Sequence, residues 1–89
     1  MKENILYQSK DQWYPDYEVK VVQLKNPRHG KLTMSYKDEV FYTQIVPVAY
    51  GAPFGADMAD IQAWGHIACA MTDKHLASRG ISAQPPENN

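Results

Sequence analysis

The sequence predicts an α+β domain, in which a small antiparallel sheet of about three strands, a meander, packs against one C-terminal helix. Two observations predict this fold. Apolar residues recur with the two-residue rhythm of strands through much of residues 17–48, whereas residues 56–79 form one long run with helical periodicity. The chain has 89 residues and no internal repeat. We therefore expect a single domain over residues 1–81.

The N-terminal residues 1–16 are expected to form an aromatic lead-in arm. Its apolar residues 5–7 either start a strand that extends the sheet or lie across it. Trp13 and Tyr14 come just before Pro15, which disfavours helix in the residue that it follows. The arm is therefore predicted to be extended or turned rather than helical.

The first clear strand is predicted over residues 17–25. Its apolar positions alternate as far as Val21 and then shift by one residue at Val22, which is the pattern that a β-bulge produces. Residues 26–30 contain proline and glycine and predict a turn. Clean alternation over residues 31–36 predicts the next strand.

The last predicted strand covers residues 39–48, after a tight turn at Lys37 and Asp38. It is rich in β-branched and aromatic residues and carries apolar side chains on both faces. This composition is typical of a buried strand, so we expect the segment to be the central or most buried strand. Pro47 has no N–H to donate, so pairing should fail near it.

The helix is predicted within residues 56–79. Asp57, or Asp60 if the helix starts later, can accept the free N–H groups of the first turn. Gly80 fits the left-handed position that follows many helices. Residues 82–89 have no apolar periodicity and are expected to form a disordered tail.

One face of this helix should lie on the sheet. A helical projection puts the following residues on one stripe: Ile61, Trp64, Ala68, Met71 and His75. Beside it runs a ridge of small residues: Gly65, Ala68, Cys69 and Thr72. We expect this ridge to let the helix approach the sheet closely.

Charge and composition narrow the classes of function. The formal net charge is −1, which provides no overall attraction for nucleic acid. There is one cysteine, so an intramolecular disulfide is impossible, and no segment approaches the roughly 20 apolar residues that span a bilayer. We expect a cytoplasmic protein that does not enter a membrane.

No pattern for catalysis, metal binding or nucleotide binding stands out. His66 and Cys69 could form a reactive pair, since they lie three residues apart on a helix, but a packed cysteine is the favoured interpretation. The histidines and acidic residues meet no accepted metal-ligand spacing. The prediction is a protein that is not an enzyme and needs no metal or cofactor.

A basic turn supports one alternative. Residues 25–31 place Lys25, Arg28, His29 and Lys31 at the tip of a predicted hairpin. Such a tip could contact phosphates, with nearby tyrosines as stacking surfaces for bases. The alternative prediction is therefore a nucleic-acid-binding protein that uses this turn.

The aromatic content supports the favoured function. The chain has 6 Tyr and 2 Trp, more than a thin one-helix core is expected to absorb, and such rings are common in protein interfaces. We expect an aromatic surface, opposite the helix or along a sheet edge, built from Trp13, Tyr14, Tyr17 and Tyr36. The favoured function is a small non-catalytic protein-binding module, such as a phage or mobile-element inhibitor or adaptor that occludes a host protein complex. Pairing of two copies into a homodimer is left open.

Overall fold

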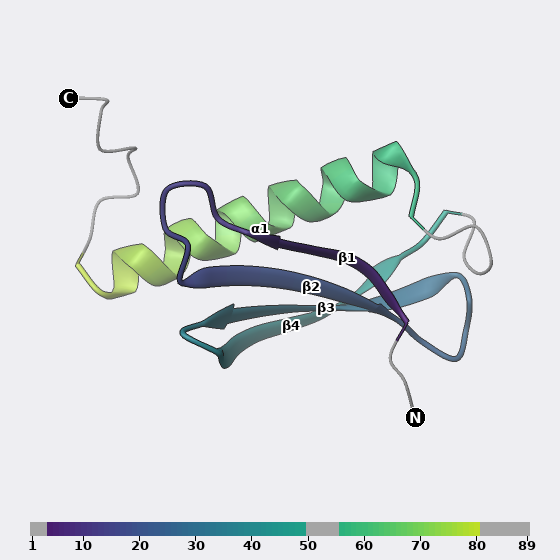
Figure 1. Cartoon of the computed structure of the whole chain (residues 1–89), viewed down its shortest axis with the longest axis horizontal. Helices are drawn as coiled ribbons and strands as arrows, with labels where there is room; N and C mark the ends of the chain where they lie inside the picture. The colour runs from purple at the N-terminus through teal and green to yellow at the C-terminus, as the bar shows by residue number, and fades with distance from the viewer. Residues whose placement is uncertain (1–3, 50–55, 81–89) are drawn as a thin grey trace.

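The computed structural model describes residues 4–49 and 56–80. A four-stranded antiparallel sheet lies against one helix (Figure 1), which confirms the predicted α+β class. The elements are β1 (Ile5–Lys10), β2 (Tyr17–Gln23), β3 (His29–Tyr36), β4 (Glu39–Pro47) and α1 (Met58–Ser78). The strand beyond the three expected ones comes from the N-terminal arm.

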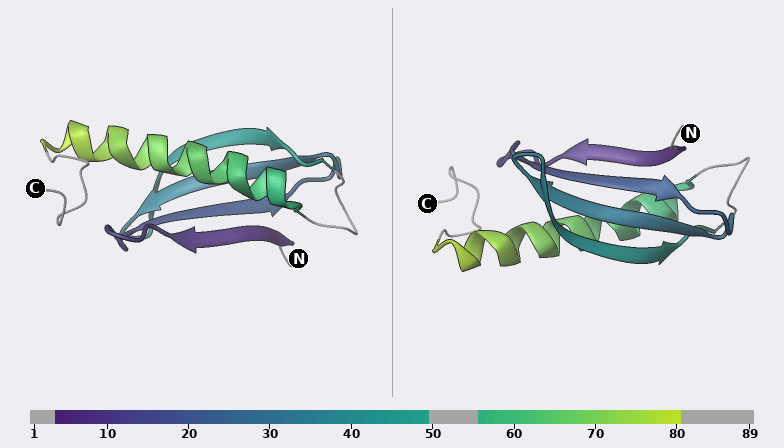
Figure 2. Two further views of the ribbon diagram at one scale, coloured as in Figure 1. Left: turned by 90° about the horizontal axis from the view of Figure 1, so that it is seen from above. Right: turned by 90° about the horizontal axis from the view of Figure 1, so that it is seen from below.

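The strands follow one another across the sheet in the order β1-β2-β3-β4. This order makes β1 and β4 the two edge strands, as both views in Figure 2 show. The expectation that residues 39–48 form the central strand is therefore wrong. In a meander the last strand pairs only with the one before it, whatever its composition.

The predicted bulge in β2 is also wrong. Tyr17 to Gln23 pair with β3 in an unbroken register, with Val21 opposite Leu32 and Val22 opposite Lys31. The irregularities lie in the edge strands, between Ile5 and Tyr7 in β1 and opposite the Met34/Ser35 step in β4. Val22 continues the alternation of β2 and lies on the other face of the sheet. Because its side chain is apolar like that of Val21, the sequence pattern looked as if the strand had shifted by one residue.

The turn from β3 to β4 is as tight as predicted. Lys37 and Asp38 have φ values of 50° and 67°, so both lie in the left-handed region that a two-residue hairpin turn requires. β4 ends at Pro47, also as predicted.

The helix boundaries match the predicted signals. Asp57 is the N-cap and accepts the Asp60 N–H at 2.9 Å, while the Asp60 carboxylate accepts the Asp57 N–H, which completes a capping box. Asp60 also accepts the Ala49 N–H at 3.1 Å, which ties the helix start to the chain just after β4. At the other end, Gly80 has φ 76°.

The core lies between α1 and one face of the sheet (Figure 2, left). Its buried apolar residues are Val19, Val21, Leu32, Met34, Val46, Val48 and Trp64. Of the predicted stripe, Trp64 is buried and Ala68 and Met71 pack against the core, but Ile61 is exposed. Thr72 and Leu76 are buried instead, so the buried stripe of the helix is rotated towards its small residues.

The small-residue ridge does not bring the helix into tight contact at Gly65. A Cβ atom added there would meet no atom within 4 Å. The expected close approach is therefore absent at that position. Residues 50–55, between β4 and α1, and the predicted disordered tail at residues 82–89 lie outside the described residues.

Candidate functional site

The helix covers only one face of the sheet, so the other face is the largest regular surface that the described residues leave uncovered (Figure 2, right). The strand registers arrange its side chains in rows that cross all four strands. One row is Ile5, Val22, Lys31 and Ile45, each directly opposite the next. Three of its four members are aliphatic, although neighbouring strands usually place polar residues on a solvated face.

Two further rows follow along the strands. The middle row is Gln8, Lys20, Thr33 and Thr43, and the last row is Lys10, Glu18, Ser35 and Val40. The polar residues hold one another in place: the Gln8 amide donates to the Glu18 carboxylate at 2.9 Å, and the Thr33 hydroxyl donates to the Lys20 carbonyl at 3.3 Å. The face therefore changes from aliphatic at one end to polar and charged at the other.

Several aliphatic side chains of this helix-free face are exposed. Ile5, Val40 and Ile45 have exposed fractions of 46%, 58% and 53%. A hollow of about 350 Å³ lies among Lys20, Val22, Leu24, Lys31, Thr33 and Val40. The result is an apolar depression with lysine side chains around it.

The charges of this face are unevenly distributed. At its polar end, Glu18, Asp16 and Asp38 line hollows together with Lys10 and Lys20. Around the apolar hollow, the charged residues are Lys20 and Lys31, so this part of the face is positive.

The predicted aromatic surface is not found on this face. The three rows contain no aromatic side chain. Tyr17 is only 1% exposed, so the expectation that it contacts a partner is wrong. Its position opposite Tyr36 puts it on the helix side of β2, where its hydroxyl forms a 2.6 Å hydrogen bond with His75 Nδ1. The Tyr17 ring is therefore buried between the sheet and the helix.

Tyr36 is half-buried in the same cluster of rings. Its centroid lies 4.7 Å from that of Tyr17 and 5.4 Å from the His75 ring. The Arg79 guanidinium lies 4.6 Å from its centroid, a cation–π distance. These contacts give Tyr36 a role in holding the C-terminal end of α1 on the sheet, and they leave part of its surface open.

Trp13 and Tyr14 lie on the loop between β1 and β2. The Asp11 carboxylate accepts both of their backbone N–H groups at 2.9 Å, which fixes the loop. Trp13 is 45% exposed, whereas Tyr14 is half-buried. Of the four predicted aromatic contacts, Trp13 is the most exposed, and the four do not form one continuous surface.

The basic turn lies between β2 and β3. Lys25, Arg28 and His29 are exposed there, and the Lys31 side chain lies on the helix-free face. Arg28 Nε donates to the Val48 carbonyl at 3.3 Å, so this guanidinium is held beside the end of β4. Tyr17 and Tyr36, two of the described tyrosines, lie at the opposite end of the same hairpin. These two rings are therefore not available as stacking surfaces at the basic tip.

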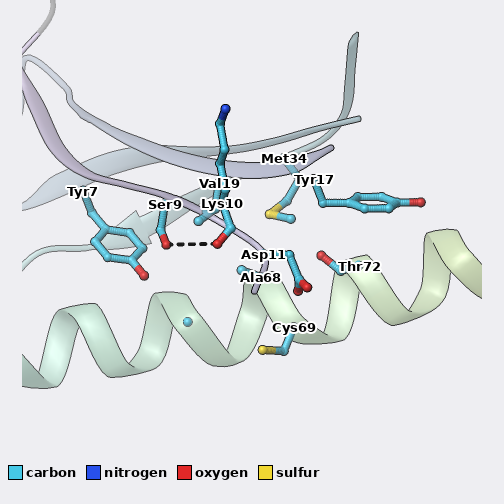
Figure 3. Close-up of a pocket in the computed structure, with 11 residues that line it drawn as sticks. Tyr7, Ser9, Lys10, Asp11, Tyr17, Val19, Met34, Ala68, Cys69 and Thr72 are labelled. Carbon is cyan, nitrogen blue, oxygen red and sulfur yellow. Dashed lines mark hydrogen bonds between the residues drawn. The ribbon is translucent and has the colours of Figure 1, made fainter. Parts of the chain in front are cut away.

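A small pocket separates β1 from α1 (Figure 3). Its volume is about 110 Å³, room for only a few water molecules. It is lined by Tyr7, Ser9, Lys10, Asp11, Tyr17, Val19, Met34, Gly65, Ala68, Cys69 and Thr72. The small residues of the helix thus border open space. The Ser9 hydroxyl in this pocket donates to the neighbouring Lys10 carbonyl at 3.4 Å.

Cys69 is exposed rather than packed as a small core residue, which corrects that expectation. Partial burial raises the pKa of its thiol, and the negative charges of Asp11 and Asp73 raise that pKa further. A raised pKa leaves less of the reactive thiolate at neutral pH. This environment is the opposite of the one that activates a cysteine nucleophile.

Among residues 4–49 and 56–80, no three His, Cys, Asp or Glu side chains converge as metal ligands would. Within the same ranges, α1 is not apolar enough to cross a bilayer. Comparison with protein-family models, with curated proteins and with solved structures finds no match.

The sequence predicted a binding surface opposite the helix or along a sheet edge, but it did not predict the aliphatic residues of the helix-free face. Two signals could have found them. The apparent phase shift at Val22 and Leu24 comes from apolar side chains that lie on this face. The apolar residues on both sides of β4 include Val40 and Ile45, which are exposed because β4 is an edge strand.

Proposed function

We propose that the protein is a small non-catalytic protein-binding module that binds its partner through the helix-free face of the sheet. The observation that carries this proposal is the apolar hollow that Val22, Leu24 and Val40 line on that one face, with Lys20 and Lys31 around it. An exposed apolar patch with a polar rim is typical of interaction sites. The rigid backbone of a sheet also keeps the entropic cost of binding low.

The charges of the face indicate the chemistry of the partner. Lys20 and Lys31 line the apolar hollow, so a fitting surface offers aliphatic side chains surrounded by carboxylates. A chain of 10.1 kDa that covers such a surface can block access to a larger complex. This is the action of a phage or mobile-element inhibitor or adaptor in the cytoplasm, and a chain with a single cysteine suits that reducing compartment.

A charge-reversal pair tests the proposal. Tagged wild-type protein and the variants Lys31→Glu and Lys74→Glu are used to capture partners from lysate of the source or host, with nuclease present. Both lysines are exposed, but Lys31 lies on the helix-free face and Lys74 on the helix. We expect the same protein to be captured by wild type and Lys74→Glu and to be lost with Lys31→Glu.

Equal capture by all three proteins would contradict the helix-free face as the binding surface. Treatment with nuclease and washing with salt test the alternative function, which is nucleic-acid binding through the basic turn. If wild type instead recovers nucleic acid that salt removes, and changing Lys25, Arg28 and Lys31 together abolishes this recovery, the basic turn is the functional site.

A further inference from the structure

The exposed edge of β4 is unusual in composition. Residues 40–48 contain no charged side chain and are mostly β-branched or aromatic. Natural sheets protect such edges with charges, proline or bulges, because an open strand can pair with another chain. β4 has a bulge near Phe41 and a proline at its end, but Tyr42 to Val46 lie between these two features without such protection.

The main chain of this stretch is ready to accept another strand. The Val48 N–H donates to the Arg28 carbonyl at 2.8 Å, and in an antiparallel pair the bonded residues alternate. The backbone groups of Val46 and Gln44 therefore point towards β3, and those of Thr43 and Ile45 point away from it. No other strand in the described ranges pairs with this edge.

The charges at the two ends of β4 differ. The strand begins at Glu39, after Lys37 and Asp38, and it ends beside the Arg28 guanidinium, which donates to the Val48 carbonyl, and the Asp60 carboxylate, which accepts the Ala49 N–H. A second β4 that runs antiparallel to the first brings Glu39 of each copy to the end that holds Arg28 of the other. A parallel arrangement would place like charges together.

We propose that β4 is a self-association edge, through which two copies pair antiparallel around a two-fold axis at Gln44. Thr43 of each copy then exchanges backbone hydrogen bonds with Ile45 of the other. The pairing ends naturally where Phe41, at the bulge, meets Pro47, which has no N–H. The two four-stranded sheets become one continuous sheet, and β4 gains the central position that its composition predicts.

The pairing also covers exposed apolar surface. Ile45 is 53% exposed in one copy, and in this register the two Ile45 side chains become diagonal neighbours on the helix-free face. The groups that meet are thus apolar at the centre and oppositely charged at both ends. A second copy of this chain therefore matches the edge both in its apolar centre and in its charged ends.

The test measures the mass of the purified full chain by sedimentation equilibrium over a concentration series. We expect a concentration-dependent shift to twice the 10.1 kDa of one chain. Ile45→Lys should weaken the dimer by about tenfold or more, because it places two charges close together at the centre. A wild-type chain that is monomeric at every concentration would overturn the proposal.

Ile5→Lys is the matched control. Ile5 lies at the other end of the same cross-strand row, on the opposite edge strand, with a similar exposed fraction of 46%. The control should dimerise as wild type does. If Ile5→Lys weakens the dimer as much as Ile45→Lys, or if Ile45→Lys has no effect, β4 is not the interface.

A charge swap tests the direction of pairing. Arg28→Glu and Glu39→Arg should each weaken the dimer, and the double variant should recover most of the affinity, because each contact is restored with reversed charges. Two single variants without effect would contradict the antiparallel arrangement. These measurements need no partner protein, so they stand or fail independently of the lysate capture proposed above.

Discussion

The two faces of this sheet are built from the same strands but differ in what covers them. On β3, Leu32 and Met34 point under the helix and are buried, while Lys31 and Thr33, which alternate with them, point to the helix-free face. The comparison shows that a domain with one covering helix can bury only one set of alternating residues. Aliphatic residues on the other face, such as Val22, therefore lie outside this core.

The largest effect on stability is expected from removing Trp64, the largest buried side chain packed on the helix-covered face. Trp64 is buried and its ring centroid lies 6.1 Å from that of Tyr7. Trp64→Ala should cost about 3–5 kcal/mol of unfolding free energy, a large part of the stability of a small domain. Urea unfolding followed by circular dichroism measures this loss. Met58→Ala, at an exposed position of the same helix, is the control and should change little.

A smaller loss of unfolding free energy is expected at Gly30, where the helix-covered face is tightly packed. A Cβ atom at Gly30 would lie 3.0 Å from Val21 Cγ1 and 3.4 Å from Val48 Cγ2. Gly30→Ala should therefore destabilise the fold by about 1–3 kcal/mol through overpacking. An unchanged urea midpoint would mean that the valines move aside without cost.

The hydroxyl of Tyr17 tests whether this ring belongs to the covered face. Tyr17→Phe keeps the ring and removes the 2.6 Å hydrogen bond to His75 Nδ1. We expect a loss of about 1 kcal/mol in unfolding free energy. If stability is unchanged while partner capture is lost, Tyr17 is an interface residue and its assignment to the core fails.

Substitution of Gly65 by alanine should raise the stability of the fold, whereas substitution of Gly30 should lower it. Its added Cβ meets no atom within 4 Å, and it lies inside α1. Gly65→Ala should stabilise the protein by about 0.5–1 kcal/mol, because alanine is the better helix former. Thermal unfolding measures the gain, and a lower melting temperature would show that the pocket beside β1 does not tolerate a methyl group.

The smallest effect concerns reactivity rather than stability. Burial and the charges of Asp11 and Asp73 raise the pKa of the Cys69 thiol, so Cys69 should react slowly with iodoacetamide at pH 7.5. Asp11→Asn removes one negative charge and lowers that pKa, which increases the thiolate fraction. The rate should rise by about twofold at pH 7.5 and converge with wild type well above the thiol pKa. A slower reaction in the variant would contradict this assignment.

Much of the fold follows from local sequence signals. The capping box at Asp57 and Asp60, the left-handed Gly80 and the tight turn at Lys37 and Asp38 depend on contacts between residues close in the chain. The periodicity of the strands and the helix is local in the same sense. These features give the α+β class before any tertiary contact is known.

The candidate site was much harder to predict. Trp13 is exposed as expected, but Tyr17 is buried, and the exposed Val40 and Ile45 lie in the strand that composition indicates as most buried. Side-chain type alone does not distinguish an aromatic ring that completes a core from one that awaits a partner. The distinction depends on whether the helix lies over that ring.

By itself, the sequence determined three of the four strands, the helix with its two ends, and the tight turn at Lys37 and Asp38, because propensity, capping and alternation act over a few residues. Only the tertiary structure decided that β4 is an edge and that Val22 belongs to the helix-free face. Strand order and the side of the sheet that the helix covers are set by packing between residues far apart in the chain. That packing left the lysine-lined face and the uncharged edge open to other molecules.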